Sequence, residues 1–116
     1  MPIKLYYLDD EPELLELFSD LISSEHVAIT TFSDPLLALD AIKANPPDLL
    51  FLDYRLPHTT GDQIALQVPA SIPKVLITGD LDVTLHAKYE AKFAKPVSTK
   101  DVKAFLSAVR SRGPTG

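Results

Sequence analysis

Residues 48–53 constrain the fold most, because four consecutive apolar residues separate the two aspartates at their ends. A strand with one wet face alternates apolar and polar residues, whereas a strand covered on both faces is apolar throughout. Strands of the second kind belong to parallel sheets with helices on both sides. We therefore expect residues 48–53 to be a central strand of an α/β domain.

Two strand and helix units precede this segment. Residues 3–8 and 27–32 are rich in β-forming side chains, and each run is followed by acidic residues and then a proline, Pro12 or Pro35, suited to a first helical turn. Apolar residues then recur with the helical period. They are Leu14, Leu15, Phe18, Leu21 and Ile22 in the first helix, of about 12 residues, and Leu36, Leu39 and Ile42 in the second, which Asn45, Pro46 and Pro47 end.

The second half of the chain continues the alternation with weaker signals. A loop at 54–60 leads past Gly61 to a short helix around 62–67, and residues 74–78 form a fourth buried strand. We expect a short fourth helix at 83–91 and a minimal fifth strand at 92–94. Ser98 and Asp101 then form a capping box for a closing helix, whose apolar residues are Val102, Phe105, Leu106 and Val109.

Five alternations of strand and helix predict a doubly wound parallel sheet with right-handed crossovers. A length of 116 residues suits one domain. We place it at 1–112 and expect 113–116 to be a disordered tail or the start of a linker, since residues 110–116 carry no core pattern. The chain has no cysteine, no apolar start suited to a signal peptide and no long apolar run, so we expect a cytoplasmic location.

The charge of the chain excludes several kinds of partner. With 11 basic and 16 acidic residues the net charge is -5, and no basic stripe occurs, so nucleic acid and anionic membrane are poor partners for this domain alone. The glycines, at 61, 79, 113 and 116, fit neither a dinucleotide fingerprint nor a P-loop. The three histidines, at 26, 58 and 86, lack the spacing of a zinc site.

Polar side chains gather where the predicted strands end. Chemistry in open parallel sheets lies at the carboxyl ends of the strands. Asp9 and Asp10 follow the first strand, Asp53 ends the third, Thr78 ends the fourth and Lys95 follows the fifth. Three carboxylates at one edge repel one another unless a cation lies among them, and hard oxygen ligands suit Mg²⁺. With a lysine and a hydroxyl donor nearby, this set predicts an aspartyl-phosphate site.

Each of these residues also has a structural interpretation. The acidic cluster at 9–11 could only cap a helix, Thr78 could only be a strand residue, and Lys95 could only be a surface charge. Their convergence from four strand ends favours the site. We leave Asp80 and Asp82 outside it, as residues of a solvated loop, and interpret Tyr6 and Tyr7 as packing residues.

Residues 3–110 resemble the receiver domain of two-component response regulators, which has a flavodoxin-like sheet of strand order 2-1-3-4-5. Several motifs carry the resemblance together. They are the acidic pair Asp9-Asp10, the segment Leu52-Asp53-Tyr54-Arg55-Leu56-Pro57 with Gly61 further on, Thr78 followed by Gly79, and Lys95-Pro96.

The resemblance implies a role for each site residue. They are Asp53 as the phosphoacceptor, Asp10 as a direct Mg²⁺ ligand, Asp9 as a ligand through water, the Arg55 backbone carbonyl as a further ligand, and Thr78 and Lys95 as contacts of the phosphoryl group. Such a domain catalyses only its own phosphorylation and dephosphorylation. It receives the phosphoryl group from a sensor histidine kinase or a phosphotransfer protein and acts on an output partner that the sequence does not identify. The resemblance also allows a dimer that forms on phosphorylation.

The chain departs from the family in two places. The family has an aromatic residue three positions before the lysine, whereas Lys92 stands there and Phe93 follows, so the sequence leaves open which of the two replaces the aromatic switch. The intervals from Asp53 to Thr78 and from Thr78 to Lys95 are shorter than is typical. We therefore expect the third and fourth helices to be trimmed.

Two other functions compete with the signalling switch. A Mg²⁺-dependent phosphohydrolase with an aspartyl nucleophile would have a second aspartate two positions after Asp53, where Arg55 stands. An interaction module whose switch has decayed would fit the missing aromatic residue, but the complete acidic site is evidence against it.

Overall fold

A computed structural model of the chain describes residues 2–80 and 82–112. Its main sheet has the strand order β2-β1-β3-β6-β7, and every neighbouring pair is parallel. The strands are β1 (Ile3–Leu8), β2 (Val27–Phe32), β3 (Leu49–Asp53), β6 (Lys74–Thr78) and β7 (Ala91–Ala94). Counted along the main sheet alone, this is the order 2-1-3-4-5, so the predicted doubly wound sheet with a central third strand is confirmed.

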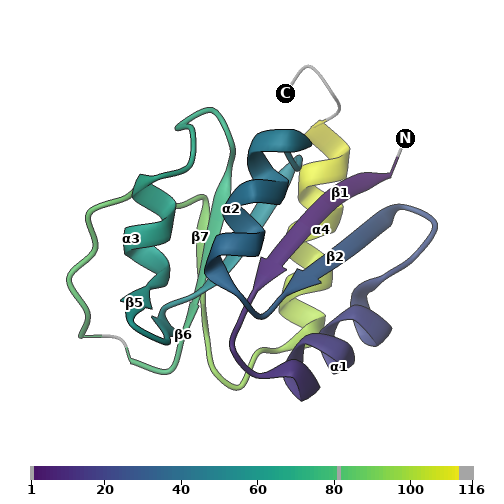
Figure 1. Ribbon diagram of the computed structural model, residues 1–116. Coiled ribbons are helices and arrows are strands. Elements are labelled where there is room, and N and C mark those ends of the chain that lie inside the picture. The colour runs from purple at the N-terminus through teal and green to yellow at the C-terminus, as the bar shows by residue number, and fades with distance from the viewer. Residues whose placement is uncertain (1, 81, 113–116) are drawn as a thin grey trace.

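Helices cover both faces of the sheet, as Figure 1 shows, with α2 and α3 in front and α4 behind. The helices are α1 (Pro12–Ile22), α2 (Pro35–Ala44), α3 (Gly61–Leu66) and α4 (Thr99–Arg112). Their starts follow the signals in the sequence. Pro12 and Pro35 lie in first turns, the Asp34 carboxylate accepts the Leu36 N–H, and the Ser98 hydroxyl accepts the Asp101 N–H.

The core has one cluster on each face of the sheet. The cluster under α1 and α4 is aromatic. Tyr7 and Phe18 lie with ring centroids 4.7 Å apart, and Phe51 stacks on Phe93 with centroids 6.4 Å apart. The cluster under α2 and α3 is mostly aliphatic. Because side chains alternate along β7, Phe93 faces the aromatic core while its neighbour Lys92 is exposed.

The buried stripes of the first two helices are narrower than their apolar patterns. Leu21 is 45% exposed and Leu36 is 71% exposed, although both belong to the apolar sets that predicted these helices. The side chains of α1 that are buried are Leu15, Phe18 and Ile22, and those of α2 are Ala38 and Ile42. Only the residues that point directly at the sheet are covered, and apolar residues at the edges of the stripe stay in water.

The predicted fourth helix at 83–91 is wrong. Residues 82–90 form neither helix nor strand, and β7 starts at Ala91, one residue earlier than predicted. The backbone N–H groups of His86 and Ala87 donate to the carboxylate of Asp62. These N–H groups would have to bond to backbone carbonyls four residues earlier in a helix, so the contact with Asp62 replaces it.

Smaller differences occur at three other places. The loop predicted at 54–60 contains a hairpin of β4 (Arg55–Leu56) and β5 (Thr59–Thr60), with exposed His58 in the left-handed conformation (φ 62°) at its tip. Helix α3 starts at Gly61 rather than at 62. Helix α4 runs to Arg112, although residues 110–112 carry no core pattern, and the tail predicted at 113–116 lies outside the described residues. Within the described part of the chain, no helix is long and apolar enough to cross a membrane.

Candidate functional site

The predicted site residues converge at one edge of the sheet. Asp9 follows β1, Asp53 ends β3, Thr78 ends β6 and Lys95 follows β7, and these four strands are neighbours. Parallel neighbours end at the same edge, which brings the four side chains into one region.

Three carboxylates form the acidic part of the site. One oxygen of each of Asp9, Asp10 and Asp53 lies within 4.8 Å of the others, and Asp9 and Asp53 are buried while Asp10 is exposed. Three hard oxygen donors without histidine or sulfur suit Mg²⁺. The residues present therefore fit the ion that the sequence predicts.

Lys95 links two of the carboxylates. Its ammonium nitrogen lies 3.0 Å from Asp53 Oδ1, 3.2 Å from Asp9 Oδ2 and 3.8 Å from Glu11 Oε1. Burial lowers the pKa of Lys95, but the hydrogen bond to Asp53 and the charges of Asp9 and Asp53 outweigh it and raise the pKa above its ordinary value. Lys95 therefore stays charged at the centre of the site.

The ionised form of the Asp53 carboxylate is destabilised by its surroundings. Burial raises its pKa, the hydrogen bond from Lys95 lowers it, and the charge of Asp9 raises it again, with a result of about 6. The side chain is still largely ionised at neutral pH. It is therefore a buried anion whose charge is only partly compensated, which suits a nucleophile that works beside a cation.

Both carboxylate oxygens of Asp9 accept hydrogen bonds from the protein. Its Oδ1 accepts the Glu11 N–H at 3.0 Å, and its Oδ2 accepts the Tyr7 hydroxyl at 2.9 Å in addition to the bond from Lys95. Burial and the nearby charge of Asp9 raise the pKa of Tyr7, so its hydroxyl stays a donor. The interpretation of Tyr7 as a packing residue missed this bond, although residues two apart on a strand share a face.

Asp80, left out of the predicted site, engages two of its members. The Thr78 hydroxyl donates to the Asp80 carbonyl at 3.1 Å and accepts the Asp80 N–H at 3.0 Å. The Arg55 guanidinium donates to the Asp80 carboxylate at 2.7 Å. Thr78 therefore lies at the predicted edge with its hydroxyl turned to Asp80, and the Arg55 side chain joins the loops that follow β3 and β6.

Gly61 packs against the backbone of Asp53. A Cβ atom at position 61 would lie 2.2 Å from the Asp53 carbonyl oxygen, well inside van der Waals contact. The Gly61 N–H donates to the Tyr54 carbonyl at 2.7 Å. Glycine is therefore required for α3 to start so close to the end of β3.

A third buried carboxylate, Asp62, lies directly after this glycine and was not predicted. It accepts the His86 N–H at 2.8 Å, the Ala87 N–H at 3.0 Å and the Tyr89 hydroxyl at 2.6 Å. Burial alone would raise the pKa of Asp62, but these bonds outweigh it and hold the pKa below its ordinary value. No local pattern in the sequence marks Asp62, because its partners lie more than 20 positions away.

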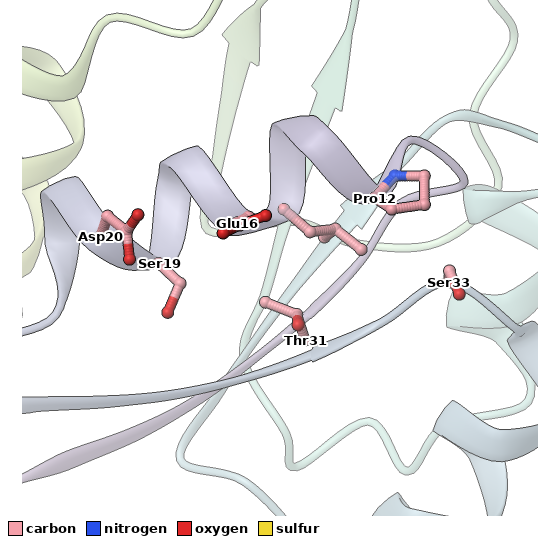
Figure 2. Close-up of a pocket in the computed structure, with 7 residues that line it drawn as sticks. Pro12, Glu16, Ser19, Asp20, Thr31 and Ser33 are labelled. Carbon is pink, nitrogen blue, oxygen red and sulfur yellow. The ribbon is translucent and has the colours of Figure 1, made fainter.

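A pocket between α1 and β2 is separate from the acidic site. Figure 2 shows Glu16, Ser19 and Asp20 of α1 on one side and Thr31 and Ser33 on the other. Its volume is about 340 Å³, and Asp9, Asp10, Asp53 and Lys95 are not among its lining residues. The pocket therefore adds nothing to the predicted chemistry.

Residues 6–106 match the family described as the response regulator receiver domain. The chain belongs to this family. Its five-stranded parallel sheet is therefore that of a receiver domain of two-component response regulators.

Related proteins agree with this assignment. The chain is 27% identical to the transcriptional regulatory protein BaeR of Escherichia coli O6:H1 over 94% of this chain and 48% of the relative. It is 26% identical to the polar-differentiation response regulator DivK of Brucella anthropi over 96% of both chains. A CheY-like receiver domain from Methanospirillum hungatei superposes with a TM-score of 0.84 at 18% identity, over 100% of both chains.

The receiver domain spans about half the length of several of the relatives that it matches, including BaeR and the DNA-binding response regulator MtrA of Mycolicibacterium smegmatis. The activities of those whole proteins therefore do not transfer to it directly.

Proposed function

We propose that Asp53 accepts a phosphoryl group from the phosphohistidine of a sensor histidine kinase or a phosphotransfer protein, in a Mg²⁺-dependent reaction that switches a partner-binding surface. The observation that supports this most is the contact of 3.0 Å between Lys95 and the buried Asp53 carboxylate, at the centre of the three-carboxylate cluster. A phosphoryl group on Asp53 would lie within reach of Lys95 and of any cation held by the cluster.

Mg²⁺ would be held by the carboxylates of Asp10 and Asp53 and by the Arg55 backbone carbonyl, with Asp9 acting through water. The bonds from Tyr7, Glu11 and Lys95 to Asp9 support this division, because both Asp9 oxygens already have donors, whereas Asp10 is exposed. When bound, the ion neutralises the negative charge that phosphoryl transfer brings together at the site.

The transfer itself uses few protein groups. An ionised oxygen of Asp53 forms the new bond to phosphorus as the bond between phosphorus and the donor histidine nitrogen breaks, and the electron pair of that bond returns to the imidazole. Lys95 faces the charge on the transferred group. Asp53 is available for this attack at neutral pH because its pKa is about 6.

Thr78 connects the transfer to a change of conformation. Its hydroxyl has one hydrogen, which it gives to the Asp80 carbonyl in the unphosphorylated domain. Donation of this hydrogen to a phosphoryl oxygen would break the bond to the Asp80 carbonyl and leave Asp80 held through the Arg55 guanidinium. We therefore propose that phosphorylation loosens the chain directly after Thr78.

Intact mass after incubation with acetyl phosphate and Mg²⁺ tests this function. We expect a gain of one phosphoryl group, about 80 Da, in the parent protein and none in Asp53→Asn. Asp48→Asn is a matched control, because Asp48 precedes the same strand at its other end and accepts the Lys4 N–H. Phosphorylation of Asp53→Asn would show that another residue is the phosphoacceptor. Steady turnover of phosphate esters would favour a phosphohydrolase.

The wider setting follows from the same proposal. The domain acts in the cytoplasm, catalyses only its own phosphorylation and dephosphorylation, and binds an output partner or a second copy of itself after phosphorylation. Its net charge of -5 disfavours direct binding of nucleic acid by this domain alone.

A further inference from the structure

We propose that Asp62 is a positioning residue that fixes the far end of the 82–90 segment, so that phosphorylation of Asp53 moves the part of this segment before His86 and leaves the rest in place. This inference rests on the proposed function. We call residues 82–90 the latch segment. Figure 1 shows the latch segment passing beside α3 on its way to β7.

The contact between Asp62 and the latch segment is strong and buried. Asp62 is 2% exposed, and both carboxylate oxygens accept bonds from the segment, at 2.6 to 3.0 Å. Its three donors come from the stretch between His86 and Tyr89. A buried carboxylate that lost these donors would keep its desolvation cost without compensation, so this end of the segment is costly to release.

Asp62 is also fixed relative to the phosphoacceptor. Gly61 directly precedes Asp62 and packs against the backbone of Asp53. A Cβ atom at position 61 would lie 2.2 Å from the Asp53 carbonyl oxygen. Its N–H donates to the Tyr54 carbonyl. A change at the Asp53 side chain therefore leaves the backbone that carries Asp62 in place.

The near end of the latch segment is held differently. The Asp82 N–H donates to the Asp80 carboxylate at 3.0 Å, and the backbone of Asp80 exchanges two bonds with the Thr78 hydroxyl. A phosphoryl group on Asp53 would compete for the Thr78 hydroxyl hydrogen, while the Asp80 carboxylate also accepts a bond from the Arg55 guanidinium. The near end of the latch segment is thus held through the Thr78 hydroxyl, which would reorient on phosphorylation. The far end is held by the Asp62 carboxylate, which would stay in place.

This arrangement takes the place of the helix that the sequence predicts. In the latch segment, Thr84, His86 and Lys88 are exposed, while Ala87 and Tyr89 pack against the core cluster under α3. The part free to move, residues 82–85, is therefore short, with exposed Asp82 and Thr84 alternating with half-buried Val83 and Leu85. It would present a changed surface to a partner without any helix being displaced.

Amide hydrogen exchange of the full chain, followed by NMR with and without acetyl phosphate and Mg²⁺, tests the proposal. We expect faster exchange for the amides before residue 86 in the phosphorylated protein, and unchanged exchange for His86 and Ala87. In Asp62→Asn the amides of His86 and Ala87 should exchange about tenfold faster even before phosphorylation, equivalent to the loss of about one hydrogen bond.

A milder pair of variants keeps the test valid if Asp62→Asn does not fold. Tyr89→Phe removes one of the three donors to Asp62, and Tyr6→Phe removes a matched hydroxyl that donates to the Asn45 carbonyl elsewhere. Faster exchange at His86 and Ala87 is expected in the first variant and not in the second. Equal exchange in both variants would overturn the role of Asp62.

The mass spectrum of the same sample separates the two proposals. No gain in mass would contradict the proposed function, and with it the movement inferred here. A gain in mass together with faster exchange at His86 and Ala87 in the parent would contradict only the role of Asp62 as a fixed point.

Discussion

Asp53 and Asp62 are two buried carboxylates on either side of Gly61, with 3% and 2% exposure, and their surroundings are opposite. Asp53 faces Asp9 and Asp10 and shares one ammonium group with Asp9. Asp62 receives three hydrogen bonds from one segment. The pKa of Asp53 is raised to about 6 by burial, against the bond from Lys95, while the bonds to Asp62 outweigh burial and lower its pKa.

The difference separates the proposed phosphoacceptor from a carboxylate whose contacts are structural. A buried carboxylate whose charge is only partly compensated can still bind a metal ion or accept a phosphoryl group, but it lowers the stability of the fold. A carboxylate whose partners are complete holds the chain together and has little left to offer a ligand. The comparison therefore predicts effects of opposite sign when each charge is removed.

Asp62→Ala should have the largest effect. It would leave the His86 and Ala87 N–H groups and the Tyr89 hydroxyl without their acceptor, so we expect the free energy of unfolding in urea to fall by roughly 3 kcal/mol. Asp34→Ala is the control, because the Asp34 carboxylate caps α2 through the Leu36 N–H, and such a cap contributes about 1 kcal/mol. A smaller loss in Asp62→Ala than in Asp34→Ala would contradict the structural role.

Asp53→Asn should act in the opposite direction. Removal of a buried and partly compensated charge should raise the metal-free free energy of unfolding at pH 7 by about 1 to 3 kcal/mol, and Asp10→Asn should do so more weakly because Asp10 is exposed. Mg²⁺ should stabilise the parent more than either variant. Lower melting temperatures in both variants, with an equal gain from Mg²⁺, would show that the carboxylates do not share a metal site.

The pH dependence of stability separates the two carboxylates further. The folded pKa of Asp53, about 6, is above its ordinary value of 3.8, so the folded state holds the extra proton between these values and stability falls as the pH rises through them. The fall is at most about 3 kcal/mol. Asp53→Asn should lack it. The stabilisation from Asp62 is instead present above its ordinary pKa and lost in stronger acid. If the metal-free stability of the parent rises from pH 4 to pH 6 relative to Asp53→Asn, the raised pKa assigned to Asp53 is wrong.

Local patterns in the sequence predicted most of the fold and most of the site. The apolar run before Asp53 predicted the central strand, and the rule that parallel strands end at one edge placed Asp9, Thr78 and Lys95 beside it. These inferences needed only the order of the elements. The family resemblance added their roles, which remain proposals for this chain.

The helix predicted at 83–91 failed for a physical reason that local patterns do not contain. Its N–H groups found an acceptor in Asp62, which is 24 positions before His86. The bonds from Tyr7 to Asp9 and from Arg55 to Asp80 were missed as well. The first could have been found from its spacing on the strand, whereas the second joins two loops that only the folded sheet brings together.

Lys92→Ala should have the smallest effect. Lys92 is exposed on β7, while Phe93 packs against Phe51 and Phe105, so the family's aromatic position is occupied by a side chain in water. We expect the free energy of unfolding to stay within about 0.5 kcal/mol of the parent and the phosphorylation-dependent spectral change to be kept. Loss of that change would make Lys92 part of the switch.

The opposite surroundings of Asp53 and Asp62 can be measured directly by NMR titration of the side-chain carboxyl carbons without metal, with Asp53→Asn and Asp62→Asn assigning the two signals. We expect Asp53 to titrate near pH 6 and Asp62 to titrate below its ordinary value of 3.8. Titration of Asp53 at or below 3.8, or of Asp62 above it, would contradict the claim that the first is kept reactive and the second is held by its partners.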